Sequence, residues 1–180
     1  MTLQELDFSI LYWIQANLRC PFLDGLMPFV TALGEYGAVW ILAALALIAA
    51  KPHRRCGITL ALGLICSLLL GNLLLKPLAA RPRPCWLDET VTLLVAMPRD
   101  FSFPSGHSLS GFIAAVILLR YDRRFGIPAL ILAILLAFSR LYLFLHFPSD
   151  VLAGILLGVG VGLAVSLLGD RFIRKKEDWV

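Results

Sequence analysis

Five apolar runs of helical length, separated by charged stretches, restrict the fold of this chain more than any other feature. They extend from about Gly34 to Ala50, Gly57 to Leu75, Ser105 to Tyr121, Gly126 to Phe144, and Asp150 to Leu168. A helix crosses a bilayer with about 20 apolar residues, and these runs lack the period-two alternation of an outer-membrane β-barrel. The pattern therefore predicts an all-α bundle of five transmembrane helices.

The composition supports a single membrane domain. Hydrophobic residues make up 59% of the 180 residues and charged residues 16%, whereas a soluble domain has about 25% charged residues. The length suits one compact unit, so we expect residues 1–180 to form one integral membrane domain. The net charge of +4 does not indicate a nucleic-acid partner, because the basic residues interrupt apolar segments and form no continuous stripe.

Residues 5–33 allow two interpretations. Apolar side chains recur at helical spacing in a stretch too short to cross a bilayer: Phe8, Leu11, Ile14 and Leu18. This spacing is typical of an amphipathic helix that lies in the membrane interface. The segment from Phe22 to Leu33 either extends the first span or pairs with the preceding helix as an extra crossing, which would give six spans.

The distribution of cations predicts the orientation of the chain in the membrane. One set of connecting segments, together with the C-terminal region, carries most of them: Lys51, Arg54, Arg55, Arg120, Arg123, Arg124, Arg171, Arg174, Lys175 and Lys176. Because cytoplasmic segments are enriched in Lys and Arg, this side is predicted to be cytoplasmic. The C-terminus is then inside and the N-terminus outside.

Three polar clusters stand at the predicted external ends of the spans. They are Lys76 with Arg83-Pro84, then Pro104-Ser105-Gly106-His107, then Ser139-Arg140 with His146 and Asp150. Ionisable groups beside apolar spans are costly and by default functional. Lys supplies a point charge, Arg guanidinium groups engage two anion oxygens at once, and the N–H groups at a helix start attract anions. Together the clusters predict a phosphate-binding site with a histidine nucleophile.

The order and spacing of these clusters resemble the phosphatidic acid phosphatase type 2 superfamily, which includes vanadium haloperoxidases and glucose-6-phosphatase. Six residues separate Lys76 from Arg83, five separate Arg140 from His146, and three separate His146 from Asp150. The resemblance covers residues 76–150. It implies a helical membrane fold whose chemistry needs no metal and no other cofactor.

The resemblance also implies a role for each residue. His146 is expected to attack phosphorus and form a phosphohistidine, while Asp150 holds the other imidazole nitrogen. His107 is expected to protonate the leaving oxygen and then to activate water. The expected phosphate-binding residues are Lys76, Arg83, Ser105, Gly106 and Arg140. Because Pro148 lies between His146 and Asp150, we expect a turn there, with Asp150 near the start of the last span.

These roles imply a metal-independent lipid phosphatase. Small bacterial members of the family act on undecaprenyl pyrophosphate, so this lipid is the expected substrate; phosphatidate, phosphatidylglycerophosphate and lipid A are alternatives. The expected location is the bacterial cytoplasmic membrane, with the active site on the periplasmic or extracellular side. A phospholipid transporter or flippase is a hypothesis of another class, but no inverted repeat or paired broken span is evident. A catalytically inactive scaffold is disfavoured because the motif set is intact.

Two further patterns concern packing. Gly154, Gly158 and Gly162 recur at four-residue steps in the last span, which permits close helix approach. We favour packing within the bundle, and a homodimer interface is the alternative. Cys20 and Cys85 both fall on the external side in this topology, so a disulfide between them is allowed, although connectivity cannot be read from sequence.

Three other basic residues stay outside the predicted site. Arg81 and Arg99 either help to bind phosphate or simply lie on the external loop. His53, in the loop Lys-Pro-His-Arg-Arg, is expected to be structural, because it lacks acidic companions at motif spacing.

Overall fold

The computed structural model describes residues 2–177, with side chains as far as Asp170. Arg171, Arg174, Lys175 and Lys176, which contribute to the predicted orientation, therefore have side chains outside the described residues. The described part is helical and contains no strand. Its α-helices are α1 (Leu3–Asn17), α2 (Pro21–Leu33), α3 (Ala38–Ala49), α4 (Arg54–Ser67), α5 (Lys76–Ala79), α6 (Pro84–Leu87), α7 (Gly106–Tyr121), α8 (Arg123–Tyr142) and α9 (Pro148–Glu177).

Short helices of other types connect several of these elements. The 3₁₀-helices are η1 (Glu35–Gly37) and η2 (Lys51–His53), and a π-helix, η3 (Leu68–Leu75), continues α4 toward Lys76. Side-chain caps explain two of the helix starts. The Ser105 hydroxyl accepts from Ser108 N at the start of α7, and the Asp122 carboxylate accepts from Arg124 N at the start of α8.

Apolar helices confirm an integral membrane protein. Three segments are long and apolar enough to cross a bilayer: Lys51–Leu87, Arg123–Tyr142 and Pro148–Asp170. A fourth crossing is possible if the pair Pro21–Leu33 and Glu35–Ala49, bent by 43°, counts as one span. α7 is apolar but has only 16 residues, so the predicted count of five stays a prediction.

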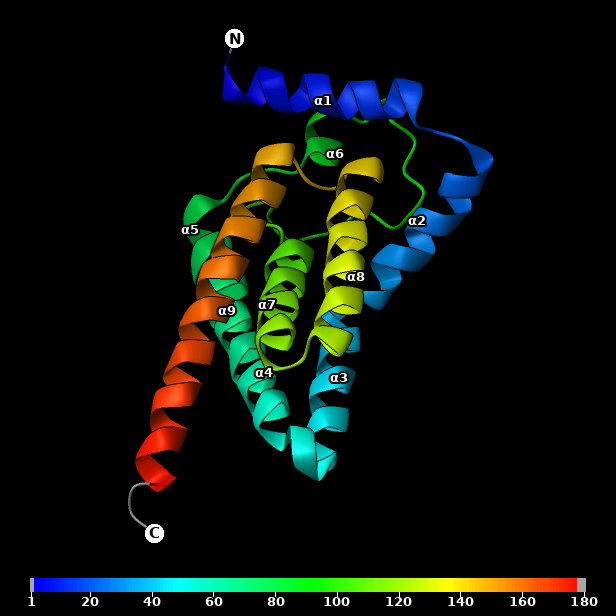
Figure 1. Cartoon of the computed structure of the whole chain (residues 1–180). Coiled ribbons are helices and arrows are strands. Elements are labelled where there is room, and N and C mark those ends of the chain that lie inside the picture. Colours follow the sequence, from blue (N-terminus) through cyan, green and yellow to red (C-terminus); the bar gives the residue numbers. More distant parts are fainter. Residues whose placement is uncertain (1, 178–180) are drawn as a thin grey trace.

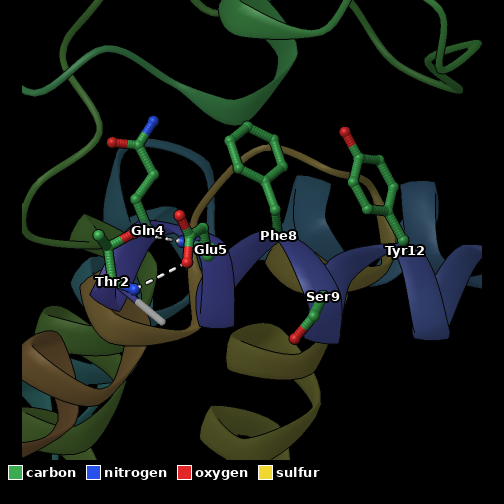
Figure 2. A pocket seen from close by; sticks show the side chains of 6 residues that line it. All are labelled: Thr2, Gln4, Glu5, Phe8, Ser9 and Tyr12. Atoms are coloured by element: carbon green, nitrogen blue, oxygen red, sulfur yellow. Dashed lines mark hydrogen bonds between the residues drawn. The ribbon is translucent and has the colours of Figure 1, made fainter.

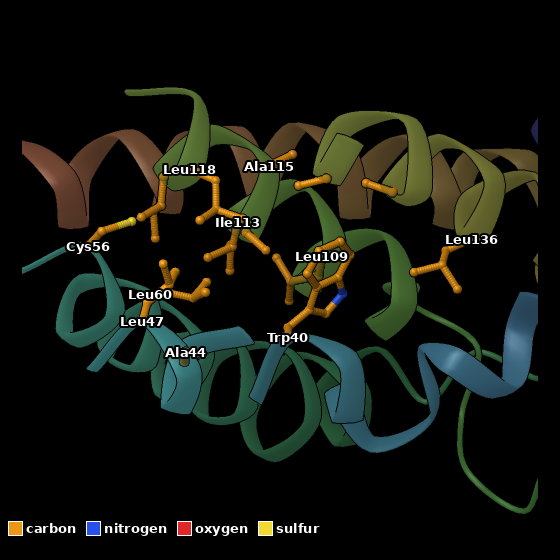
Figure 3. Packing of buried hydrophobic residues seen from close by; sticks show 14 of the residues in the cluster. Trp40, Ala44, Leu47, Cys56, Leu60, Leu109, Ile113, Ala115, Leu118 and Leu136 are labelled. Atoms are coloured by element: carbon orange, nitrogen blue, oxygen red, sulfur yellow. The ribbon is translucent and has the colours of Figure 1, made fainter. Parts of the chain in front are cut away.

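α7 is the central helix of the bundle. It packs against α8, α9 and α4, and α3 packs against α4 (Figure 1). The largest apolar core forms where α3, α4 and α7 meet, around Trp40, Leu60, Leu109 and Ile113 (Figure 3). Leu60, Leu109 and Ile113 are fully buried. The same helix therefore carries the core along its length and the Ser105-Gly106-His107 segment at its start.

The two ends of the bundle differ in what they carry. α1 lies across one end, the end that also holds α6 and the α8–α9 connection (Figure 1). The α3–α4 and α7–α8 turns lie at the opposite end, together with the C-terminal end of α9 (Figure 1). Because those two turns contain basic residues of the predicted cytoplasmic set, the cations gather at the end away from the polar clusters.

The glycine face of α9 is covered by α7 of the same chain. A Cβ on Gly154 would lie 2.7 Å from the Ser105 carbonyl oxygen, and one on Gly158 would lie 2.8 Å from that of Leu109. Gly162 would meet Val116 at 3.0 Å. This confirms packing within the bundle. The alternative of a homodimer through this face is wrong, because the face is already occupied.

All four cysteines are free thiols. Cys20 is exposed at the start of α2, whereas Cys85 is buried in α6. The structure therefore does not contain the disulfide between Cys20 and Cys85 that the sequence allows.

Replacing Gly158 with Ala should destabilise the protein by about 1–3 kcal/mol, because the new methyl group overpacks the contact with α7. Gly160→Ala is the matched control on the same helix, since a Cβ at Gly160 would have no neighbouring atom within 4 Å. That substitution should be neutral or stabilising by up to about 1 kcal/mol. Thermal unfolding in detergent measures both, and equal midpoints for the two variants would contradict the packing described.

Candidate active site

The structure brings the three polar clusters together at the end of the bundle that α1 crosses. Arg83 is the cap residue before α6, and its Nη1 lies 3.0 Å from His146 Nε2 in the α8–α9 connection. Ser105 N, at the start of α7, donates to the Asp150 carbonyl oxygen at 3.1 Å. Segments far apart in the sequence thus meet at one end of the bundle. α9 begins at Pro148, two residues before the expected start of the last span, and Asp150 lies in its first turn, near the helix start as expected.

Arg83 is the most constrained cation of the cluster, with only 2% of its surface exposed. Its Nε donates to the Asp100 carbonyl oxygen at 2.7 Å, and its Nη1 donates to the Leu145 carbonyl oxygen at 2.8 Å. Its Nη2 donates to the Asp100 carboxylate at 2.7 Å. Because a buried charge must be paired and hydrogen-bonded, these acceptors fix the guanidinium group beside His146.

The contact with Arg83 assigns the tautomer of His146. A guanidinium group can only donate, so Nε2 is the acceptor and the neutral ring carries its proton on Nδ1. Nε2 therefore has the lone pair that a nucleophile uses. Burial lowers the pKa of His146 well below its usual range, and the positive charges of Arg83, Arg140 and Lys76 lower it further. The ring is consequently unprotonated at neutral pH.

Ser102 lies between His146 and Asp150. His146 Nδ1 is 3.9 Å from Asp150 Oδ2, which is too long for a hydrogen bond. Ser102 Oγ is 3.3 Å from Nδ1 and donates to Asp150 Oδ2 at 2.5 Å. The direct hydrogen bond predicted between the imidazole and Asp150 is therefore replaced by a chain from Nδ1–H through the Ser102 hydroxyl to the carboxylate.

Asp100 contacts both cations of the first cluster. Its carboxylate accepts from Lys76 Nζ on one oxygen and from Arg83 Nη2 on the other. Burial alone would raise the pKa of Asp100, but the hydrogen bond from Lys76 and the charges of Arg83 and Lys76 hold it at about 2. Its side chain is 53% exposed, whereas that of Arg83 is 2% exposed. The Asp100 carboxylate therefore lies between these two cations, Lys76 and Arg83, and the solvent.

Thr31 of α2 joins the second and third clusters. Its carbonyl oxygen accepts from His107 Nε2 at 3.1 Å, and its hydroxyl accepts from Arg140 Nη1 at 2.7 Å. A carbonyl oxygen cannot donate, so His107 carries a proton on Nε2 and its Nδ1 is the basic nitrogen of the neutral ring. Gly34 packs closely against this ring: a Cβ on Gly34 would lie only 2.7 Å from His107 Cδ2.

Ser105 and Gly106 start α7 next to these groups. Ser105 is fully buried, and its hydroxyl accepts from Ser108 at the helix start. Gly106 is partly exposed, and the nearest atom to a Cβ there would be Asn72 Oδ1 at 3.6 Å. Ser105 is therefore engaged in capping, whereas the backbone of Gly106 is open to approach.

Sequence patterns do not identify three residues that the structure adds to the site: Asp100, Ser102 and Thr31. Asp100 and Ser102 stand just before the Pro-Ser-Gly-His segment, so their place in the chain was the available signal. Thr31 offers none, because it lies far upstream on an apolar helix. Arg81, one of the two open candidates for phosphate binding, contacts Asp150 instead. The other candidate, Arg99, is exposed.

Two other features bear on ligands. Among residues 2–170, no group of three His, Cys, Asp or Glu side chains could hold a metal ion. An open surface pocket lies along α1 and is lined by Thr2, Gln4, Glu5, Phe8, Ser9 and Tyr12 (Figure 2). None of these residues belongs to the three clusters, so this pocket contributes nothing to their chemistry.

Residues 56–174 match the sequence pattern of the PAP2 superfamily. The chain belongs to this superfamily. It is 37% identical to the undecaprenyl-diphosphatase of Sulfolobus acidocaldarius over 158 residues, which cover 86% of this chain and 75% of that protein. It is 35% identical to the decaprenylphosphoryl-5-phosphoribose phosphatase of Mycobacterium tuberculosis over 146 residues, covering 80% of this chain and 79% of that protein.

The fold agrees with this assignment. The crystal structure of Aquifex aeolicus LpxE superposes with a TM-score of 0.78 at 27% identity, covering 92% of this chain and 98% of that chain. The predicted family, the helical membrane fold and the assignment as a lipid phosphatase are therefore confirmed.

Asp100→Asn should tighten the binding of phosphate-like anions to this PAP2 protein. The Asp100 carboxylate competes for Lys76 and Arg83 and repels an incoming anion, whereas the amide does neither. We expect orthovanadate to inhibit phosphate release about 5- to 30-fold more tightly, equivalent to about 1–2 kcal/mol of repulsion removed.

Asp88→Asn is the control, because it removes the same charge from the same connection between α6 and α7, where Asp88 accepts from the Tyr12 hydroxyl at 2.8 Å. Its inhibition constant should stay within about twofold of the wild-type value, as expected for a distant, screened charge. Unchanged or weaker inhibition of Asp100→Asn would contradict competition by its carboxylate.

Proposed function

We propose that this PAP2 protein hydrolyses a phosphate or pyrophosphate group on a polyprenyl lipid through a phosphohistidine on His146. The contact between Arg83 and His146 carries the proposal. It places an unprotonated imidazole nitrogen beside a fixed guanidinium group, as nucleophilic attack on a bound phosphate requires.

Three cations converge on the proposed phosphate position. Besides Arg83, Lys76 is 9% exposed and Arg140 is 7% exposed. Arg140 Nε is buried and has no hydrogen-bond partner within the part of the chain that the structure describes. A buried donor without an acceptor is costly, and a phosphate oxygen would supply one. The Gly106 backbone and the start of α7 add the favourable end of a helix dipole, and Ser105 supports this segment.

In the first step, His146 Nε2 attacks phosphorus and the bond from phosphorus to the leaving oxygen breaks. Before this attack, Arg83 donates to a phosphoryl oxygen of the bound substrate in place of Nε2, so that the nitrogen lone pair is available to form the new bond. Positive charge develops on the imidazole, and the chain through Ser102 to the Asp150 carboxylate stabilises it. Asp150 thus acts through Ser102 as well as by its charge.

In both steps, His107 moves the proton. Because its Nε2 donates to the Thr31 carbonyl oxygen, the added proton of the imidazolium form lies on Nδ1. Nδ1 gives this proton to the leaving oxygen, and the neutral ring then accepts a proton from water. The resulting hydroxide attacks phosphorus, the phosphorus–nitrogen bond breaks, and inorganic phosphate is released with His146 restored.

The relatives favour a polyprenyl substrate. Two of them are named for lipids with undecaprenyl and decaprenyl chains, and the first of these names a diphosphate. We therefore propose undecaprenyl pyrophosphate as the substrate, with undecaprenyl phosphate and phosphate as products. Phosphatidate, phosphatidylglycerophosphate and lipid A phosphates are the alternatives. A flippase would need neither the neutral imidazole nor its link to Asp150.

We further propose that the active site faces the outside of a bacterial cytoplasmic membrane. The basic α3–α4 and α7–α8 turns lie at the opposite end of the bundle (Figure 1), and basic ends face the cytoplasm. Five crossings follow if the bent α2–α3 pair and α7 both span. α1 would then lie in the outer interface, because it lies across that end and exposes apolar side chains: Leu3, Leu6, Ile10 and Trp13.

His146→Ala should abolish phosphate release from undecaprenyl pyrophosphate in detergent, with a loss of at least about 10³-fold, because the nucleophile is removed. His53→Ala is the control, because His53 lies in η2, at the opposite end of the bundle from His146. Its ring packs on that of Phe125, with 5.2 Å between the ring centres. Retained activity in His146→Ala would disprove the nucleophile. Faster hydrolysis of phosphatidate or phosphatidylglycerophosphate in the same panel would disprove the substrate alone.

Phosphate release should persist in EDTA, because Lys76, Arg83 and Arg140 supply the positive charge that a metal ion supplies elsewhere. The measurement compares initial rates with and without the chelator, after metal-free purification. A strict requirement for added magnesium would mean that the phosphate is not held by these three cations alone.

A further inference from the structure

Arg81 has a set of contacts that phosphate binding does not explain. Its Nη1 donates to Asp150 Oδ1 at 2.5 Å and to the Ser149 hydroxyl at 2.7 Å, while its Nη2 donates to Asp7 Oδ2 at 2.8 Å. The guanidinium carbon lies 4.2 Å from the centre of the Phe147 ring. Arg81 therefore binds Asp150 on the oxygen opposite to the one that Ser102 contacts.

Asp7 is the unexpected member of this group, because it belongs to α1. It is 2% exposed and shares the buried side of that helix with Leu11 and Ile14. Its Oδ1 accepts from Ser149 N at 2.9 Å, and its Oδ2 accepts from the Ser149 hydroxyl at 2.5 Å. A buried carboxylate is stable only when it is paired and hydrogen-bonded, and Arg81 and Ser149 meet that need.

We infer that Asp7 and Arg81 are positioning residues for the proposed reaction, and that α1 is thereby part of the active site. Two carboxylates share one guanidinium group, so Arg81 is held from α1 while it holds Asp150. Asp150 in turn orients Ser102 and the proton on His146 Nδ1. This inference rests on the proposed function, because it concerns the support of His146 as nucleophile.

The arrangement predicts which kinetic constant changes. The side chains of Asp7 and Arg81 bond to Asp150 and Ser149 and not to the phosphate-binding cations, so substrate binding should not depend on them. Without the Asp7 charge, Arg81 loses its second anchor and its charge acts on Asp150 alone. The carboxylate then stabilises the positive imidazole less well, and its orientation is less fixed. The loss should therefore fall on kcat, and KM should change little.

The decisive variant is Asp7→Asn, which keeps the size of the side chain and removes its charge. We expect kcat for phosphate release to fall by about 10- to 100-fold, the scale of a small misplacement of a reacting group, with KM within about threefold. Glu5→Gln is the matched control. It removes a carboxylate from an exposed position on the same helix, and Gln can still form the capping box with Thr2.

Ser149→Ala provides a milder second variant in case Asp7→Asn does not fold. It removes the hydroxyl that touches both Asp7 and Arg81 but leaves the two ion pairs, so kcat should fall by about 3- to 10-fold. All rates are expressed per folded protein, measured by thermal unfolding and gel filtration. A purely structural role would lower the folded fraction and leave kcat per folded molecule unchanged, which would overturn the inference.

The wild-type protein and His146→Ala are assayed beside these variants. If the wild type releases no phosphate, or His146→Ala remains active, the proposed function fails. If both behave as proposed while folded Asp7→Asn and Ser149→Ala match the wild-type kcat, only the positioning role fails. A fall in kcat in both variants, with wild-type KM and an unaffected Glu5→Gln, supports it.

Discussion

The buried guanidinium group of Arg83 is the interaction on which the rest of this site depends. A charge with so little exposure is stable only with acceptors on several sides. Asp100, in the connection between α6 and α7, supplies a carbonyl and a carboxylate oxygen, and Leu145 supplies a carbonyl oxygen from just beyond the end of α8. The segments that carry these acceptors are thereby brought to one place. His146 follows Leu145 directly in the chain, so its ring also lies beside Arg83.

The bundle around this cation makes the arrangement possible. α7 is short and central, and α9 approaches it closely because Gly154 and Gly158 leave room for its backbone. The close approach sets the start of α9 beside the start of α7, where Ser105 N meets the Asp150 carbonyl oxygen. Packing along the apolar part of the helices therefore determines geometry at their polar ends.

Much of this could be predicted from the sequence. The helices follow from apolar runs, and the resemblance to the PAP2 superfamily singled out the main candidate site residues, which the structure brings to one end of the bundle: Lys76, Arg83, His107, Arg140, His146 and Asp150. Ser102 could not be predicted, because a serine in a loop has no distinguishing pattern and its role depends on the 3.9 Å separation of two other groups. Asp7 could have been noticed in the sequence, because it is an acidic residue on the buried side of an amphipathic helix. Its partner could be found only from the tertiary structure.

The bend between α2 and α3 bears on the position of the His107 ring. Gly34 at this bend lies against both the His107 ring and Leu136 of α8, with no space for a side chain. The imidazole therefore packs directly against the backbone of Gly34. Because Thr31 and Gly34 both stand at this bend, a change in its angle would alter the packing contact and the hydrogen bond of the His107 ring together.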